Sequence, residues 1–305
     1  MSEPENVPVA PSSKGAVFLR RLLSFTVLWG IVLGSLFSGN KVVSDYVFLI
    51  ILVILAAAGL QEFYGMVAKL GHDCFAKEGI FGGVLLLAAT FCYVSGRFGI
   101  AAPPSRVNDF ETSFFILFVL GLCIRQFASR HTTTGIIAIS TTLFGLMYVP
   151  WLLNFIQKIN FFGRGVEGHY YVLYFVVVTK LADCGAYAVG SLIGKHKMIP
   201  RISPGKTWEG FCGAIVVSTA ASMLFARVAG GHLSGMTTTH AVILGVVLSL
   251  AAVVGDLIES LFKREAGLKD SGRLFPGIGG ILDLLDSLLF NAPLMYLYLR
   301  HVLTP

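Results

Sequence analysis

The segment Ser260–Ser287 reads SLFKREAGLKDSGRLFPGIGGILDLLDS and places charged residues and five glycines between two long apolar runs. The rest of the 305-residue chain is mostly apolar: 55% of its residues are hydrophobic, only 13% are charged, and its mean hydropathy is +0.77. Soluble domains carry about 25% charged residues. The composition therefore indicates a protein whose solvent is largely lipid.

Nine apolar runs have about the 20-residue length that an α-helix needs to cross a bilayer. They predict an all-α integral membrane protein, a polytopic bundle of about nine transmembrane helices. The first run is long and has no small-residue cleavage site after it, so we expect a retained anchor and no cleaved signal peptide. The expected spans are 18–38, 44–68, 79–98, 112–129, 133–155, 170–193, 208–229, 240–262 and 281–300.

The placement of Lys and Arg predicts the orientation. Bases precede the first span and are densest in alternate loops, around 69–77, 125–130, 195–206 and 263–273. We therefore expect the amino terminus in the cytoplasm, the carboxyl terminus outside, and most of the net charge of +6 beside anionic lipid headgroups. A bacterial cytoplasmic membrane fits this pattern. No basic patch is interleaved with exposed aromatics, so nucleic acid is not an expected partner.

Five cysteines lie scattered along the chain, without a C-x-x-C pair. We interpret them as small apolar packing residues, and not as metal ligands or disulfide partners.

Acidic residues lie inside or at the ends of the last expected spans. Asp256 and Glu259 are three residues apart and share one helix face, and Asp283 and Asp286 repeat that spacing. Asp183 lies deeper, about 15 Å from the nearer end of its helix at 1.5 Å per residue. A simple interaction with the helix dipole explains Asp283 and Asp286 but not Asp256, which lies near a carboxyl end.

An ionised carboxylate costs several kcal/mol in hydrocarbon, so such groups normally face a polar cavity. Carboxylates without His or Cys partners suit a hard cation, above all Mg²⁺. The acids therefore predict a metal site in a polar cavity that opens to the cytoplasm.

Bases gather in the two loops next to these acids and predict a polyanionic substrate held against the metal. The glycines of PGIGG, including Gly279 and Gly280, would let backbone N–H groups approach a phosphate at the start of a helix. The bases are Lys195, Lys197, Arg201, Lys206, Lys263, Arg264, Lys269 and Arg273.

The first of these loops reads GKHKMIPRISPGKTWEG, residues 194–210. Its GKT is shared with P-loops, but a P-loop needs glycine five residues before Gly205, where this chain has Pro200. Ser203 followed by Pro204 predicts instead a helix start, with Ser as the N-cap and Pro at the first position. We expect the amides of that helix start and Lys206 to form a second phosphate site.

Two longer motifs resemble the phosphatidate cytidylyltransferase family, the CDP-diacylglycerol synthases of membranes. One is GDLIESLFKREAGLKDSGRLFPGIGGILDLLDS, residues 255–287, and the other is DCGAYAVGSLIGKHKMIPRISPGKTWEG, residues 183–210. The resemblance implies an enzyme of phospholipid biosynthesis that transfers CMP from CTP to phosphatidic acid and releases pyrophosphate. It implies Mg²⁺ as cofactor, with a second metal ion left open, and a homodimer as one alternative for assembly.

The resemblance also assigns residues. It implies that the metal is held by Asp256, Asp283 and Asp286, and that Lys263, Arg264 and Lys269 handle the phosphates. The substrate-binding residues expected in the cavity are Asp183, Ser203, Lys206, Glu209, Asp270, Gly279 and Gly280. We accordingly expect a disordered cytoplasmic tail at 1–15, N-terminal transmembrane helices at 16–160 and a catalytic transmembrane region at 161–305.

The chain departs from the family pattern at two positions: Ile278 stands where the family usually has His, and Leu284 where it usually has Arg. The resemblance implies that an imidazole, an acid or phosphate donor in relatives, and a guanidinium, a phosphate clamp or a partner of an aspartate, are missing from the site. Two other functions stay open at this point. A CTP-dependent lipid-alcohol kinase also combines many spans with acids and bases, and a secondary transporter carries acids at broken helices. A CDP-alcohol phosphotransferase is excluded because its D-G-x-x-A-R string does not occur in the sequence.

Overall fold

The computed structural model of the chain describes residues 30, 34, 39–96, 104–129, 134–163, 165–272 and 279–304. Within these residues, eight helical spans are long and apolar enough to cross a membrane. The first expected span, 18–38, lies almost wholly outside the described residues. The prediction of an all-α, multi-pass integral membrane protein is confirmed, with one small β-hairpin added to the helices.

Nine α-helices make up most of the described part of the chain. They are α2 (Lys41–Lys69), α3 (Ala76–Ser95), α4 (Pro104–Phe127), α5 (Gly135–Leu146), α6 (Leu152–Asn160), α7 (Gly168–Ile193), α8 (Trp208–Ala229), α9 (Thr238–Glu265) and α10 (Ile281–Tyr298). A π-helical turn, Met147–Trp151, joins α5 to α6 as one span, and a second one, Leu299–Leu303, extends α10. A single 3₁₀ turn, Gly230–His232, follows α8.

Local chemistry explains where several helices begin and end. The side chain of Asn40 accepts hydrogen bonds from the backbone N–H groups of Val42 and Val43 and so caps α2. Thr237 caps α9 in the same way, through the N–H of His240. Gly96 ends α3 with φ of 65°, a left-handed conformation that glycine adopts without steric cost.

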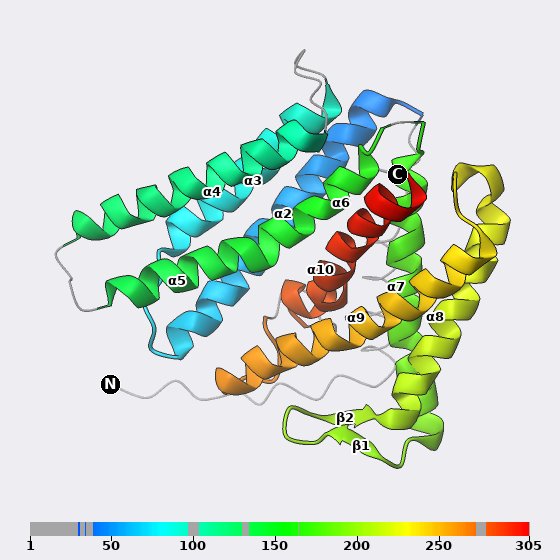
Figure 1. Ribbon diagram of the computed structural model, residues 1–305. Coiled ribbons are helices and arrows are strands. Elements are labelled where there is room, and N and C mark those ends of the chain that lie inside the picture. Colours follow the sequence, from blue (N-terminus) through cyan, green and yellow to red (C-terminus); the bar gives the residue numbers. More distant parts are fainter. Residues whose placement is uncertain are drawn as a thin grey trace, which may run out of the picture.

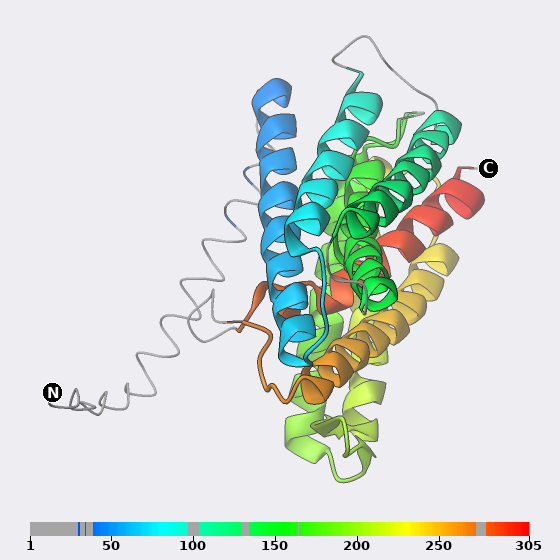
Figure 2. The same ribbon diagram turned by 90° about the vertical axis from the view of Figure 1, so that its left-hand side faces the viewer.

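Helix α10 lies between two groups of helices (Figure 1). It packs against α9 and α7 on one side and against α6 and α2 on the other. Turned by 90°, α2 and α3 run next to each other at the edge of the group that contains α2 and α6 (Figure 2). The buried core follows this arrangement, since Leu60, Leu153, Phe175, Leu285 and Leu289 are all fully or almost fully buried.

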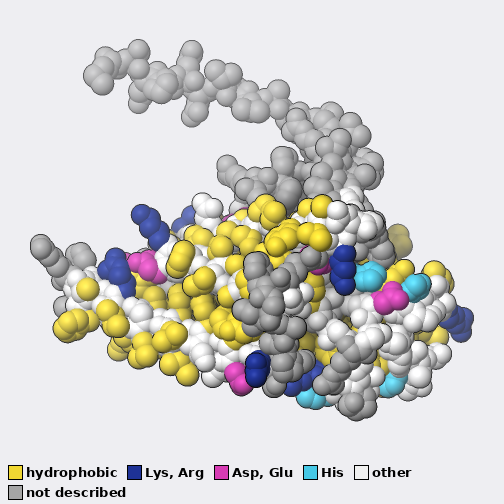
Figure 3. All heavy atoms as spheres, turned by 90° about the horizontal axis from the view of Figure 1, so that it is seen from above, with side chains coloured by type: hydrophobic (Ala, Val, Ile, Leu, Met, Phe, Trp, Pro, Cys, Tyr) yellow, Lys and Arg dark blue, Asp and Glu magenta, His cyan; other side chains and the backbone are white. Residues whose placement is uncertain are grey.

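The outside of the bundle is apolar, as expected for a surface that faces lipid. Phe127 is 93% exposed and Leu192 is 83% exposed, values that would be unusual for side chains in water. Viewed from above, hydrophobic side chains gather over the left half of the visible face, and charged side chains are scattered along its edges and over its right half (Figure 3).

The hairpin before α8 corrects one prediction. Strands β1 (Lys197–Ile199) and β2 (Ser203–Thr207) pair antiparallel, so Ser203 begins a strand, and the helix start predicted at Ser203 and Pro204 is wrong. Helix α8 starts four residues later, where the Thr207 hydroxyl accepts from the N–H of Gly210. Ser-Pro is compatible with either conformation, because proline is tolerated in an edge strand as well as at a helix start.

Candidate active site

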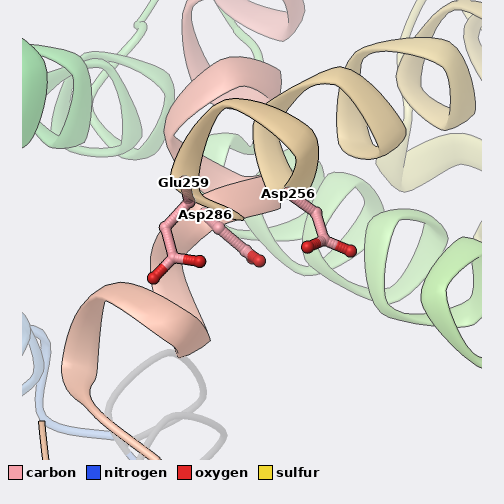
Figure 4. Close-up of side chains that lie close together, drawn as sticks. All are labelled: Asp256, Glu259 and Asp286. Carbon is pink, nitrogen blue, oxygen red and sulfur yellow. The ribbon is translucent and has the colours of Figure 1, made fainter. Parts of the chain in front are cut away.

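Three carboxylates from two helices converge beside this hairpin. Asp256 and Glu259 come from one face of α9 and Asp286 comes from α10, and one oxygen of each lies within 4.8 Å of the others. Figure 4 shows the three side chains directed to the same side of α9. Glu259 and Asp286 are buried, at 1% and 8% exposure, and Asp256 is half-buried.

A glycine makes this convergence sterically feasible. A Cβ atom placed on Gly255 of α9 would lie 2.5 Å from the main-chain oxygen of Asp286 and 3.0 Å from the ring of Phe290. Real Cβ atoms do not approach a backbone oxygen so closely, so the two helices can pack this tightly only with glycine at 255. Asp256 directly follows Gly255 on α9, and the contacting oxygen belongs to Asp286 itself. Each helix therefore carries a carboxylate of the cluster at this contact.

Two lysines hold the cluster from opposite sides. Lys206 of β2 lies 2.8 Å from Asp256 and also donates to the carbonyl of Val253. Lys263 forms ion pairs with Glu259 and with Asp283. Ion pairs of this kind offset part of the desolvation cost of carboxylates that lie in a low-dielectric region.

The donor set fits a hard divalent cation. All three residues offer carboxylate oxygens, the ligands that Mg²⁺ prefers. One buried oxygen of Glu259 pairs with the Lys263 ammonium, and the other has no hydrogen-bond donor within the described part of the chain. A buried carboxylate oxygen without a donor has lone pairs left for a metal.

Asp283, expected as a metal ligand, has other partners in this structure. It lies on α10 one turn before Asp286, and its carboxylate accepts hydrogen bonds from Lys263 (2.5 Å), from the N–H and hydroxyl of Ser271 (3.1 and 2.9 Å) and from the N–H of Gly280 (2.7 Å). These contacts make it the acidic member of a helix cap, a favourable position for a negative charge. Lys263 links it to Glu259, so Asp283 borders the carboxylate cluster.

The two expected phosphate-binding glycines lie at that same helix start. Gly279 has φ of 112°, a conformation that favours glycine, and the N–H of Gly280 donates to Asp283. A Cβ atom on Gly280 would lie 2.1 Å from the Ser271 hydroxyl, so the turn has no room for a side chain there. In this structure the Gly280 amide is already engaged by a protein carboxylate.

Glu62 of α2 is a site residue that sequence reasoning missed. Its carboxylate accepts from the N–H groups of Ile281 and Leu282 and from the hydroxyl of Ser271, each at 2.9 Å. It therefore caps α10 from a helix more than 200 residues earlier in the chain. An acid deep inside a long apolar run was the signal that could have revealed it.

A cavity of about 360 Å³ lies beside the carboxylate cluster, between α7, α8 and the hairpin. It is bordered by Asp256 and by three of the expected substrate-binding residues, Asp183, Ser203 and Lys206. Apolar groups such as Tyr187 and Phe211 complete its wall. The structure thus brings two motifs that are about fifty residues apart in the sequence to one cavity.

Other expected site residues lie elsewhere. Arg264 is exposed and donates to the carbonyls of Ile202 and Leu268, which ties the two basic loops together. Glu209 accepts hydrogen bonds from the backbone N–H of His196 and pairs with its ring.

Lys269 and Asp270 are exposed and border a different surface pocket, of about 440 Å³. Ile278, the position where the family usually has His, lies outside the described residues.

Comparison with known proteins shows to which family the chain belongs. A family model described as the cytidylyltransferase family matches residues 19–302. A phosphatidate cytidylyltransferase of Mycobacterium leprae is 42% identical over 153 residues, which are 50% of this chain and 47% of the relative. An uncharacterized protein YnbB of Escherichia coli is 36% identical over 160 residues, 52% of this chain and 51% of the relative.

A phosphatidate cytidylyltransferase of Staphylococcus saprophyticus is 35% identical over 204 residues, which are 65% of this chain and 73% of the relative. The chain spans about half the length of the first two of these relatives. The family match, in contrast, extends over nearly all of the chain and includes both halves of the cavity. The chain belongs to the cytidylyltransferase family.

Proposed function

We propose that the protein transfers CMP from CTP to phosphatidic acid, giving CDP-diacylglycerol and pyrophosphate. The observation that carries this proposal is the cluster of Asp256, Glu259 and Asp286, which opens beside a cavity bordered by Lys206 and Ser203. Family membership and the names of two relatives support it. Hard oxygen ligands next to ammonium groups suit a reaction between two phosphate-bearing substrates.

The residues present would hold one divalent cation, for which we propose Mg²⁺, on Asp256, Glu259 and Asp286. When bound, such an ion neutralises charge on phosphate oxygens. Asp283, the third ligand expected from the sequence, and a second metal ion stay predictions. Lys206, which now pairs with Asp256, is positioned to attract and orient phosphates in the cavity.

The reaction needs little acid–base chemistry from the chain. A phosphomonoester oxygen of phosphatidate attacks the α-phosphorus of CTP, the new P–O bond forms in line, and the bond to the bridging oxygen breaks to release pyrophosphate. The attacking group has a second pKa of about 6, so it is already ionised near neutral pH. Positioning and electrostatics are then the main contributions of the protein, because two anions must be brought together.

The rim of the cavity supports a lipid as one substrate. Tyr187, which borders the cavity, is 79% exposed, and Trp208 at the start of α8 is 53% exposed. Such aromatic side chains favour the boundary between headgroups and acyl chains. A phosphate inside the cavity with its acyl chains outside, in the bilayer, matches this arrangement.

We also propose that the hairpin and the end of α9 face the cytoplasm of a bacterium, with the amino terminus on the same side. The contact between Arg264 and the carbonyl of Ile202 supports a common side for both basic loops. Reporter fusions within 195–206 and within 263–272 should both report the cytoplasm. Fusions that report opposite sides of the membrane would overturn this orientation and the site together.

The function is tested with purified protein in detergent, labelled CTP and Mg²⁺, with either phosphatidate or a polyprenol as acceptor. We expect label from the cytidine part to enter lipid with phosphatidate, together with one pyrophosphate per CMP transferred, and Asp286→Asn to abolish both. Transfer of the γ-phosphate to the alcohol, without CMP transfer, would replace the synthase by a CTP-dependent kinase. Absence of turnover with both acceptors would contradict an enzyme and favour the transporter alternative.

A further inference from the structure

We infer that Lys180 of α7 is a further positioning residue of this site, one that offsets the charge of the carboxylate cluster and joins α7 to the acidic turn of α10. The inference rests on the proposed function for its kinetic part, but its charge-balancing part is measurable without turnover. Lys180 belongs to neither of the two motifs that carry the family resemblance. Lysine inside a transmembrane helix is costly and normally pairs with other polar groups.

The contacts of Lys180 all lie at the junction of α7 and α10. Its ammonium donates to the carbonyl oxygen of Leu284 at 3.0 Å and to the hydroxyl of Ser287 at 3.1 Å. It also lies 3.4 Å from the carboxylate of Asp183, one turn further along α7. The same Asp183 oxygen accepts a hydrogen bond from Ser287 at 3.1 Å, so the three side chains form a closed triangle.

This triangle is part of a polar seam between the two helices. One turn away, the buried amide of Asn291 donates to the Thr179 hydroxyl at 2.6 Å. Asp286, a member of the carboxylate cluster, directly precedes Ser287 on α10. A change in the position of Lys180 would therefore move the turn of α10 that carries Asp286, and with it Asp183 at the cavity wall.

Formal charge shows why the site needs this lysine. Five carboxylates meet around the cluster, from Asp183, Asp256, Glu259, Asp283 and Asp286, and the lysines in contact with them are Lys180, Lys206 and Lys263. These three ammonium groups offset part of the negative charge, and one divalent cation held by the cluster would offset more. Without Lys180, an excess negative charge stays in a low-dielectric region.

The position of Leu284 gives the inference a sharp test. Leu284 and Ser287 are three residues apart on α10, and Lys180 contacts the main-chain oxygen of the first and the hydroxyl of the second. A basic side chain at 284 would add a positive charge to the same turn of α10, between Asp283 and Asp286. In this chain, where 284 is leucine, Lys180 supplies that positive charge from the neighbouring helix.

The experiment is a charge-exchange cycle on the full chain in detergent. It compares the wild type with Lys180→Gln, Lys180→Arg, Leu284→Arg and the double variant Lys180→Gln/Leu284→Arg. Lys77→Gln, which removes an exposed lysine at the start of α3, is the matched control. The first readout is binding of Mn²⁺, without substrate, by electron paramagnetic resonance, and the second is CMP transfer from labelled CTP to phosphatidate.

We expect Lys180→Gln to bind Mn²⁺ several-fold more tightly, because a nearby positive charge is gone, and to lose at least tenfold in kcat, because Asp183 at the cavity wall is no longer held in place. Leu284→Arg alone should weaken Mn²⁺ binding several-fold. The double variant should return to within about twofold of the wild-type Mn²⁺ affinity and recover most of the lost CMP transfer. Lys180→Arg and Lys77→Gln should leave the Mn²⁺ affinity at the wild-type value.

Wild-type Mn²⁺ affinity in both Lys180→Gln and Leu284→Arg would overturn the inference. A double variant with the same Mn²⁺ affinity and the same CMP transfer as Lys180→Gln would also overturn it. If Lys180→Gln does not fold, Leu284→Arg still decides, since an unchanged Mn²⁺ affinity there contradicts the charge balance. If the wild type transfers no CMP, the proposed function fails, while the Mn²⁺ cycle still supports or overturns the role of Lys180.

Discussion

Asp286→Asn is expected to lower CMP transfer by at least about a hundredfold, the scale that follows the loss of a group that stabilises charge in the transition state. The substitution keeps the shape of the side chain and removes its charge. Asp286 is 8% exposed and lies between Asp256 and Glu259 of α9 and the polar contacts of α7, so water cannot readily take its place as a ligand. Asp256→Asn should have an effect of the same size, since both acids offer an oxygen to one point.

The measurement is kcat/KM for labelled CTP over a Mg²⁺ series, together with Mn²⁺ affinity of the same samples. Both variants should elute from size exclusion as the wild type does and bind Mn²⁺ at least tenfold more weakly. Asp109→Asn, at an exposed position on α4, is the matched control and should retain wild-type values. Near-normal turnover of Asp286→Asn at saturating Mg²⁺ would show that this carboxylate does not hold the metal.

Gly255→Ala should cost about tenfold to a hundredfold in CMP transfer, although it adds one methyl group and touches no substrate. The new Cβ would lie 2.5 Å from the Asp286 main-chain oxygen, so α10 must move away from α9 by several tenths of an ångström or more. That movement separates Asp286 from Asp256 and Glu259. A displacement of about 1 Å of catalytic groups costs roughly a hundredfold in rate.

Gly121→Ala is the control for Gly255→Ala. Gly121 lies within α4, and a Cβ atom there would meet no other atom within 4 Å. Alanine favours a helix over glycine by about 1 kcal/mol, so this control should be as stable as the wild type and fully active. If Gly255→Ala is equally active and binds Mn²⁺ like the wild type, close packing of α9 on α10 is not what assembles the carboxylate cluster.

The transmembrane layout could be predicted well from the sequence, because the requirement for long apolar helices in lipid leaves few alternatives. Helix α7 was expected at 170–193 and found at Gly168–Ile193, and α9 was expected at 240–262 and found at Thr238–Glu265. The three-residue spacing of Asp256 and Glu259 also placed both acids correctly on one helix face.

The membership of the carboxylate cluster depended on contacts that sequence does not display. From the spacing alone, Asp283 and Asp286 are equally good candidates for metal ligands. In the structure, however, Ser271 and Gly280 in the turn before α10 donate hydrogen bonds to Asp283. Glu259 takes the third place beside Asp256 and Asp286 because α9 approaches α10 at Gly255. The sequence spacing of the acids therefore left the membership of the cluster open, and the packing of α9 against α10 determined it.

Glu62 and Lys180 show the same limit in another form. Each is a charged residue inside an expected apolar span, and its partners on α10 lie 104 or more residues away in the sequence. Charge inside a span indicates that a partner exists, but the partner becomes known only when the helices are assembled. The helix start predicted at Ser203 failed for a related reason, since pairing with β1 competes with helix formation there.

Asp256, Glu259 and Asp286 should together form the metal site beside the cavity. A crystal structure of the protein grown with Mn²⁺ and CTP, with data collected at the Mn absorption edge, tests this directly. We expect an anomalous peak within about 2.0–2.4 Å of a carboxylate oxygen of each of the three residues, with phosphate oxygens of CTP toward Lys206. A peak bound by Asp283 and not by Glu259, or a peak away from α9, would contradict it.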